Sequence, residues 1–415
     1  MVSTNSARWR IGDSFEAEIE KVAHGGHFIV RHEGAVFFVR HAIPGERARV
    51  VVSSTGSSFN RADVVEVLQP SPDRVQPPCK FAHRLGCGGC DFQHISVNRQ
   101  RQLKSDVITE QFARITKIDV HVEVEEVSTP LYWRTRSIAT TDGTGQLGFY
   151  AVRSHSVIPV DDCLIMLKEM NMPELASRTW KPDIRVEIAT STTNERNVAI
   201  APVRGQGKAR LSEGSQILHE KVGEKSLEVS QSSFWQSNSN APAILTSVVL
   251  DFAQLRLGDQ VLDLYAGVGL FTSVIIDIIG TGGGVDLIEA SKSASADAAR
   301  NFANNPNIRI ISGDVAQHLP RITSADVVVL DPPREGAGKT VVSEILRLKP
   351  RTVVYVACDP AALARDTSYF FKKGYSLTAL RAFDLFPMTH HIECVAQFSP
   401  TNVVLEPKGK IVEGR

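Results

Sequence analysis

From about residue 240 onward, apolar runs of strand length alternate with helical patterns, and this alternation constrains the fold more than any other feature. Strand–helix alternation of this kind predicts a doubly wound parallel sheet of the α/β class. The predicted strands are Gln260–Tyr265, Gly284–Ile288, Ile308–Ser312, Val327–Leu330 and Thr352–Ala357.

The chain of 415 residues is too long for one ordinary core, and a length of about 150 residues per domain predicts two or three domains. Residues 10–68 contain short strands separated by glycine turns, which indicate a small N-terminal β-barrel. We expect a barrel over 1–70, a central mixed α+β domain over 71–232, the α/β domain over 233–400 and a loosely ordered tail over 401–415. A helix over about 97–115 is expected to pack on the α/β domain.

Composition restricts the function classes. The hydrophobic fraction of 42% and charged fraction of 22% are typical of a globular chain. No long uncharged apolar run and no signal pattern occur, so we expect a cytoplasmic protein without a membrane partner. The formal net charge of +0 is unusual for a nucleic-acid binder. The basic run Arg99–Lys104 could supply local phosphate contacts, or it could be the solvated face of a helix.

A glycine turn follows the first predicted strand, at Gly267-Val268-Gly269. Glycines let a backbone approach a ligand closely. Glu289 lies 20 residues after Gly269, at the end of the next strand, where a carboxylate can accept hydrogen bonds from ribose hydroxyls. The third glycine of the dinucleotide fingerprint is missing, which argues against NAD. Asp314, after the third strand, could contact an adenine amino group.

Six cysteines occur in the chain, and four of them suggest a metal centre. Cys87-Gly88-Gly89-Cys90 can direct two thiolates at one centre, with Cys79 nearby and Cys163 far along the chain. Four thiolates suit zinc or an iron–sulfur cluster, and spacing does not choose between them. The alternative is a set of unrelated buried thiols.

Cys358 ends the last predicted strand, and Glu393 follows 35 residues later. Asp331, in Asp331-Pro332-Pro333-Arg334, ends the strand before it. Ligands of open α/β sheets bind at these strand ends. A thiolate there could add to C6 of a pyrimidine and make C5 nucleophilic, and a base would then remove the C5 proton. Cys394, inside an apolar strand, is interpreted as a core residue.

Together these motifs resemble the RNA uracil-C5 methyltransferase family, in the branch that has an N-terminal TRAM barrel and an iron–sulfur cluster and includes 23S rRNA 5-methyluridine methyltransferases. The likeness covers nearly the whole chain. Its motifs are Gly25-Gly26, Pro44-Gly45-Glu46, the segment from Cys87 to His94, Gly148-Phe149-Tyr150, the segment from Phe234 to Asn238, Asp331–Arg334, Cys358-Asp359-Pro360 and His391-Ile392-Glu393.

The resemblance implies a role for each candidate residue. Cys79, Cys87, Cys90 and Cys163 would bind a 4Fe-4S cluster. Gln236, Tyr265, Glu289 and Asp331 would bind S-adenosylmethionine, together with Gly267, Gly269 and Asp314 of the loop region. Cys358 would be the nucleophile and Glu393 the base.

The resemblance also favours ribosomal RNA over transfer RNA as the partner of a monomeric enzyme. Two alternatives remain open from the residues. One is an exocyclic-nitrogen methyltransferase, which also uses an Asp-Pro-Pro type of loop and needs no cysteine. The other is a non-catalytic iron–sulfur protein that only binds RNA.

Overall fold

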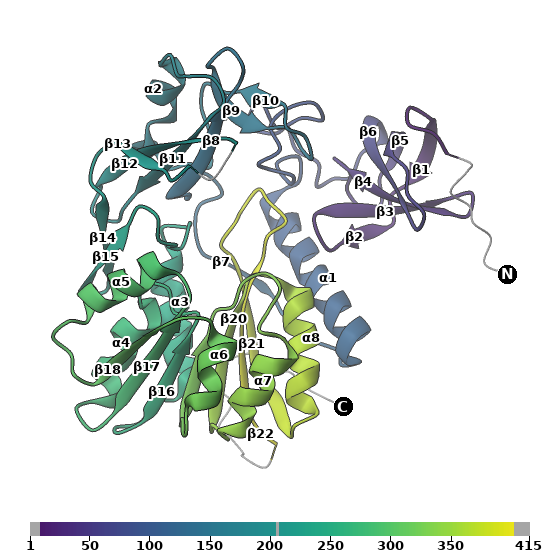
Figure 1. Cartoon of the computed structure of the whole chain (residues 1–415). Helices are drawn as coiled ribbons and strands as arrows, with labels where there is room; N and C mark the ends of the chain where they lie inside the picture. The colour runs from purple at the N-terminus through teal and green to yellow at the C-terminus, as the bar shows by residue number, and fades with distance from the viewer. Residues whose placement is uncertain (1–8, 205–206, 402–415) are drawn as a thin grey trace.

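The computed structural model describes residues 9–204 and 207–401 (Figure 1). Over these residues the chain forms an N-terminal sheet, a central sheet with a neighbouring hairpin, and a large C-terminal sheet covered by helices. The expected tail over 401–415 lies almost entirely outside the described residues. No helix of the described part is long and apolar enough to cross a membrane.

The N-terminal sheet has six strands in the order β1-β5-β6-β4-β3-β2. Apolar side chains alternate along its strands, so Phe28 and Val30 of β3 are buried while Ile29 between them is less so. Its two edge strands are joined through Ile19 and Glu20, and the Glu20 N–H donates to the Ile29 carbonyl at 2.9 Å. The sheet therefore curves until its two edges approach each other. Its strands are β1 (Ser14–Glu18), β2 (Lys21–Ala23), β3 (His27–His32), β4 (Ala35–Arg40), β5 (Arg47–Ser54) and β6 (Asn60–Gln69).

The segment after the cysteine-rich loop belongs with the C-terminal sheet. Helix α1 (Val97–Thr116) packs on α8 (Pro360–Phe371), and β7 (Val124–Glu126) pairs in parallel with β21 (Tyr375–Asp384). Lys104 of α1 is buried and its ammonium lies 2.6 Å from an Asp384 carboxylate oxygen. This basic side chain is therefore an internal ion-pair partner, neither a solvated one nor a free phosphate ligand.

The central sheet is antiparallel, in the order β10-β9-β8-β11-β12-β13, and the hairpin β14-β15 lies beyond it in the chain. Valine, isoleucine and methionine side chains pack against its inner face. The elements are β8 (Arg136–Thr141), β9 (Leu147–Tyr150), β10 (Val157–Pro159), α2 (Met172–Ser177), β11 (Ile184–Thr190), β12 (Arg196–Pro202), β13 (Arg210–Glu213), β14 (Ile217–Val222) and β15 (Lys225–Ser230).

The C-terminal sheet has eight strands in the order β18-β17-β16-β19-β20-β22-β21-β7. The first five are parallel, and each predicted strand is present to within one residue of its expected bounds. The strands are β16 (Gln260–Leu264), β17 (Gly284–Glu289), β18 (Ile308–Ser312), β19 (Val327–Leu330), β20 (Thr352–Ala357) and, after β21, β22 (Glu393–Pro400).

The sheet is mixed, which differs from the expected parallel sheet. β22 runs antiparallel to both β20 and β21. Only the loop 385–392 separates β21 from β22, and a connection that short can join antiparallel neighbours but not parallel ones. The reversal brings the start of β22 to the edge where β20 ends.

Helices cover both faces of this sheet, so its central strands are buried throughout. Side chains of one face pack with α3 and α4, and those of the other pack with α7, α8 and α1. The helices are α3 (Ala241–Ala253), α4 (Leu270–Ile279), α5 (Lys292–Asn301), α6 (Val315–His318) and α7 (Gly338–Arg347).

Candidate active site

The carboxyl ends of the parallel strands form one edge, and the predicted site residues gather along it. Strand pairing places Leu264 of β16 beside Leu330 of β19 and Ile288 of β17. Tyr265 and Asp331 directly follow these strands and Glu289 ends β17, so the three residues stand at the same level of the edge. Polar side chains at this level face the region where open α/β sheets bind ligands.

The glycine loop and Glu289 form one half of the site. The Gly267 N–H donates to a Glu289 carboxylate oxygen at 2.8 Å, and the Ser291 N–H donates to the other at 2.5 Å. Gly267 has φ +58° and open space where a Cβ would stand, which suits the close approach of a ligand. Gly269, at φ +93°, has a different reason to be glycine, because a Cβ there would lie 2.3 Å from the Phe302 ring.

Two further candidate residues for the cofactor site flank this loop. Tyr265 has a positive φ of 59°, and burial raises the pKa of its hydroxyl to about 12, with the nearby Asp314 charge adding to the effect. Asp314 is exposed, and its carboxylate caps α6 by accepting from the Gln317 N–H at 3.2 Å. Asp314 therefore has a structural task in addition to any contact with a ligand.

Asp331 stands at the centre of the edge. Gln236 is buried, and its side-chain amide donates to Asp331 at 3.3 Å, so two segments far apart in sequence meet here. Burial, helped by the charge of Asp263 and opposed by the Gln236 hydrogen bond, raises the pKa of Asp331 to about 7. A carboxyl with this pKa responds strongly to a neighbouring cation.

Cys358 and Glu393 face each other at the other half of the site. Ala357 of β20 pairs with Cys394 of β22, so the next position along the ladder sets Cys358 opposite Glu393. Burial raises the pKa of the Cys358 thiol to about 12, helped by the charges of Glu393 and Asp331 and opposed by Arg334. Glu393 is 3% exposed, and burial, with Asp331 beside it, raises the pKa of Glu393 well above its usual range.

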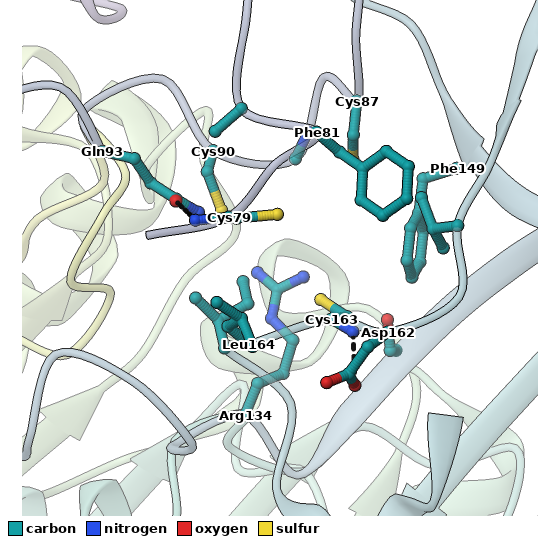
Figure 2. Close-up of a pocket in the computed structure, with 15 residues that line it drawn as sticks. Cys79, Phe81, Cys87, Cys90, Gln93, Arg134, Phe149, Asp162, Cys163 and Leu164 are labelled. Carbon is teal, nitrogen blue, oxygen red and sulfur yellow. Dashed lines mark hydrogen bonds between the residues drawn. The ribbon is translucent and has the colours of Figure 1, made fainter. Parts of the chain in front are cut away.

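The four other predicted cysteines surround one cavity of about 40 Å³ in the central part of the chain (Figure 2). Their thiols are free and partly exposed, and the Arg134 guanidinium points among them. Burial raises the pKa of the Cys87 and Cys90 thiols and brings that of Cys163 to about 11. Cys79, Cys87, Cys90 and Cys163 are thus brought together by the fold.

The cavity is otherwise lined mainly by apolar side chains, among them Phe81, Phe149 and Val160. Within residues 9–204 and 207–401, no group of three or more His, Cys, Asp or Glu side chains is arranged to hold a metal ion. Cys394, by contrast, is fully buried in β22, as its interpretation as a core residue predicted.

Sequence reasoning missed several side chains near Cys358. His24 of the N-terminal part lies 2.9 Å from Asp359, and His390 hydrogen bonds with Asp91. Asp263, which influences Asp331, was also missed, although its place inside the first predicted strand marks a buried carboxyl. The two histidine pairs span about 300 residues or more of sequence and leave no local signal.

Strand-end carboxylates and a glycine loop at the edge of an α/β sheet are typical of a site for a nucleoside-containing cofactor, and the relatives of this chain are methyltransferases. The solved structure of tRNA (uracil-54, C5)-methyltransferase from Pyrococcus abyssi, in complex with S-adenosyl-L-homocysteine, shares the fold. It has a TM-score of 0.69 and 21% identity, and the match covers 92% of this chain and 99% of that one.

Sequence relatives identify the family. Residues 208–399 match the family model described as tRNA (Uracil-5-)-methyltransferase. An uncharacterized RNA methyltransferase of Streptomyces avermitilis is 40% identical, over 96% of this chain and 100% of the relative. A second, from Corynebacterium efficiens, is 34% identical over 94% of this chain and 95% of the relative. The chain belongs to the same family as these RNA methyltransferases, and it is an S-adenosylmethionine-dependent RNA methyltransferase.

Proposed function

We propose that this enzyme methylates C5 of one specific uridine in 23S rRNA, through a covalent bond between Cys358 and C6 of the base. One observation carries this proposal. The antiparallel return of β22 sets the Glu393 carboxyl opposite the Cys358 thiol, beside Asp331 and at the edge that holds the glycine loop. Methylation at C5 requires a nucleophile and a proton acceptor in the pocket that holds the uracil ring.

The reaction begins with the Cys358 thiolate. Its sulfur bonds to C6, the C5–C6 double bond opens, and the electron pair is shared between C5 and O4 of an enolate. C5 then takes the methyl group from the sulfonium, whose sulfur keeps the bonding pair and leaves as a thioether. Glu393 removes the remaining C5 proton, the C5–C6 double bond re-forms, and the Cys358 thiolate is expelled.

The protonation state of Cys358 explains why its thiol is a weak nucleophile when no methyl donor is bound. With a thiol pKa of about 12, Cys358 carries little thiolate at neutral pH, and the acidic neighbours Glu393 and Asp331 keep it so. S-adenosylmethionine supplies the electrophilic methyl group and a positive sulfonium charge. Beside that charge, Asp331, Glu393 and Cys358 all lose protons more readily. Activation of the thiol is thereby tied to the presence of the methyl donor.

The site for S-adenosylmethionine would be formed by the half of the edge that contains the glycine loop and Glu289. We assign the ribose to Glu289, with the backbone of Gly267 and Gly269 providing close approach. Tyr265, Asp314, Asp331 and Gln236 complete this set. The open space beside Gly267 and the Gln236–Asp331 hydrogen bond support the assignment.

The test of C5 chemistry is a trap with RNA that contains 5-fluorouridine. The base cannot remove fluorine from C5 as it removes a proton, so the enzyme stays bonded to C6. We therefore expect a protein–RNA adduct that survives a denaturing gel and forms only when S-adenosylmethionine is present. Methyl transfer to ordinary RNA without any adduct would identify the exocyclic-nitrogen alternative. Binding of RNA without methyl transfer would identify a non-catalytic protein.

The choice of RNA rests on the N-terminal sheet and the cysteine segment, which we assign to a TRAM-like barrel that binds RNA and to an iron–sulfur domain. The family model and the Pyrococcus abyssi enzyme are both named for tRNA, so tRNA is the competing substrate. Transcripts of 23S rRNA and of tRNA, compared for 5-methyluridine formed by the purified enzyme, separate the two. Faster methylation of tRNA would overturn the ribosomal assignment.

We assign Cys79, Cys87, Cys90 and Cys163 to a 4Fe-4S cluster, and the four free thiols around one largely apolar cavity support this assignment. We expect anaerobically purified protein to be brown, with absorbance near ~400 nm and about four irons per chain. Cys163→Ser should lose most of this absorbance. As a control, Cys394→Ser removes a buried thiol outside the cavity and should keep it. Colourless protein with stoichiometric zinc would contradict the cluster.

A further inference from the structure

The cavity that contains Cys358 is closed on one side by the N-terminal sheet. It measures about 220 Å³ and is lined by residues of three parts of the chain. β2 and the turn after it supply Val22 to Gly26, and α1 with the segment before it supplies Phe92, Leu103, Lys104 and Val107. The remaining wall comes from the C-terminal sheet and its loops. The N-terminal part is therefore a wall of the nucleophile's pocket, not only a neighbour attached through a linker.

A hydrogen bond joins that wall to the residue next to the nucleophile. Nε2 of His24 lies 2.9 Å from Oδ2 of Asp359, the residue that directly follows Cys358. The other oxygen of Asp359 accepts from the Ala362 N–H at 2.8 Å and so caps α8. One carboxylate thus fixes the start of a helix on one side and the N-terminal turn on the other, with Cys358 beside it.

The turn fits closely against the loop that leads into Glu393. Gly26 has φ +75°, and a Cβ there would lie 2.4 Å from an Asp91 oxygen and 2.8 Å from the His390 ring. Lys21, at the start of β2, pairs with Glu110 of α1 and ties the same sheet to the helix at a separate point. The position of His24 is therefore set by the packing of its turn as well as by its own hydrogen bond.

Charges at this contact act on the nucleophile. His24 faces Asp359 at the start of α8 and Arg114 on α1, and the hydrogen bond to Asp359 is the main cause that raises the pKa of its imidazole. Cys358 faces three anionic groups, Glu393, Asp331 and Asp359, and one cation, Arg334. Lys104, His390 and His391 also line the cavity. A protonated His24 cancels the charge of Asp359, one of the groups that raise the pKa of the thiol.

We propose that His24 is a positioning residue of the methyl transfer: it holds the Cys358–Asp359 loop against the N-terminal turn and, when protonated, neutralises Asp359 so that the Cys358 thiol ionises more readily. The proposal rests on the nucleophile role of Cys358. It makes docking of the N-terminal sheet a condition for full reactivity at the catalytic sulfur.

The test compares the whole protein with three variants. His24→Gln keeps a hydrogen-bond donor without the charge, His24→Ala removes both, and Lys21→Ala is a matched control that removes a different contact of the same sheet. The readout is the rate at which N-ethylmaleimide modifies Cys358, followed by mass spectrometry of its peptide between about pH 6 and 8.5. This rate follows the thiolate fraction and needs no substrate.

We expect His24→Gln to react about fivefold more slowly than the wild type at the acidic end, where His24 is charged. The difference should shrink as the pH rises through the raised pKa of His24, because the wild type then loses the same charge. His24→Ala should also show a lower kcat/KM at every pH, whereas Lys21→Ala should follow the wild type in both measurements.

Identical pH profiles for His24→Gln and the wild type would overturn the proposal, and so would an equal loss in Lys21→Ala. Thermal unfolding of each variant separates a folding defect from these outcomes. A different measurement tests the proposed function: RNA methylation that persists in Cys358→Ala would contradict it. The maleimide result then still decides whether His24 controls the thiol.

Discussion

Replacement of Cys358 by alanine will abolish the covalent adduct and lower kcat/KM for RNA methylation by at least about 10³-fold. Without the thiolate, C5 of uracil has no route to the nucleophilic enolate, however well the donor and the RNA are bound. Donor affinity should change little, because Cys358 lies at the half of the edge occupied by Glu393 rather than at the glycine loop. Labelled-methyl transfer, gel-stable adduct and donor binding measure the three quantities.

Cys394→Ala is the matched control for this experiment. It also removes a thiol, one residue from Glu393, but that thiol is fully buried among core side chains. We expect a lower unfolding temperature from the small cavity, with the adduct retained. If Cys358→Ala still formed an adduct, the nucleophile would have to be another residue, and the proposed mechanism would be wrong.

Much of the C-terminal fold could be predicted from the sequence because its strands are covered on both faces. Such strands are short, wholly apolar runs, and the turn after the first one is marked by Gly267 and Gly269. The carboxyl ends of such strands share one edge, and this places Asp331 and Cys358 together from the sequence alone. The reversal of β22 is different. An apolar run gives no direction, and only the short loop before it hints at the antiparallel return that brings in Glu393.

Residues whose role depends on a distant partner could not be predicted. Lys104 belongs to a basic run that suggested either solvent or phosphate contact, yet its partner is Asp384, 280 residues away. His24 likewise sits in a plain glycine turn, and only the docking of the N-terminal sheet brings it to Asp359. The four cysteines of the cavity could be predicted in part, because some of them are close in sequence and one is distant. The Cys87–Cys90 pair is local, and the thiol of Cys163 joins it through the central sheet.

Replacement of Glu393 by glutamine should give the opposite phenotype to Cys358→Ala, with adduct retained and turnover lost. The thiolate and the donor remain, so addition to C6 and methyl transfer to C5 can proceed. The C5 proton then has no base to accept it, and a base of this kind contributes about 10²–10⁴-fold. The enzyme should accumulate as a covalent complex with methylated RNA, seen as a shifted band that carries label from the donor methyl group.

The pH dependence of the wild type tests the same assignment. A base must be deprotonated to act, and burial together with Asp331 raises the pKa of Glu393, while Asp331 itself has a pKa of about 7. kcat/KM should therefore rise as the pH is increased through neutrality, and activity should be lost on the acidic side. Glu344→Gln, on the outer helix α7 and paired with Arg347, is the control and should keep both turnover and the pH profile. Full turnover in Glu393→Gln would mean that another group removes the C5 proton. Asp331, whose charge influences both Cys358 and Glu393, would then be the residue to replace next.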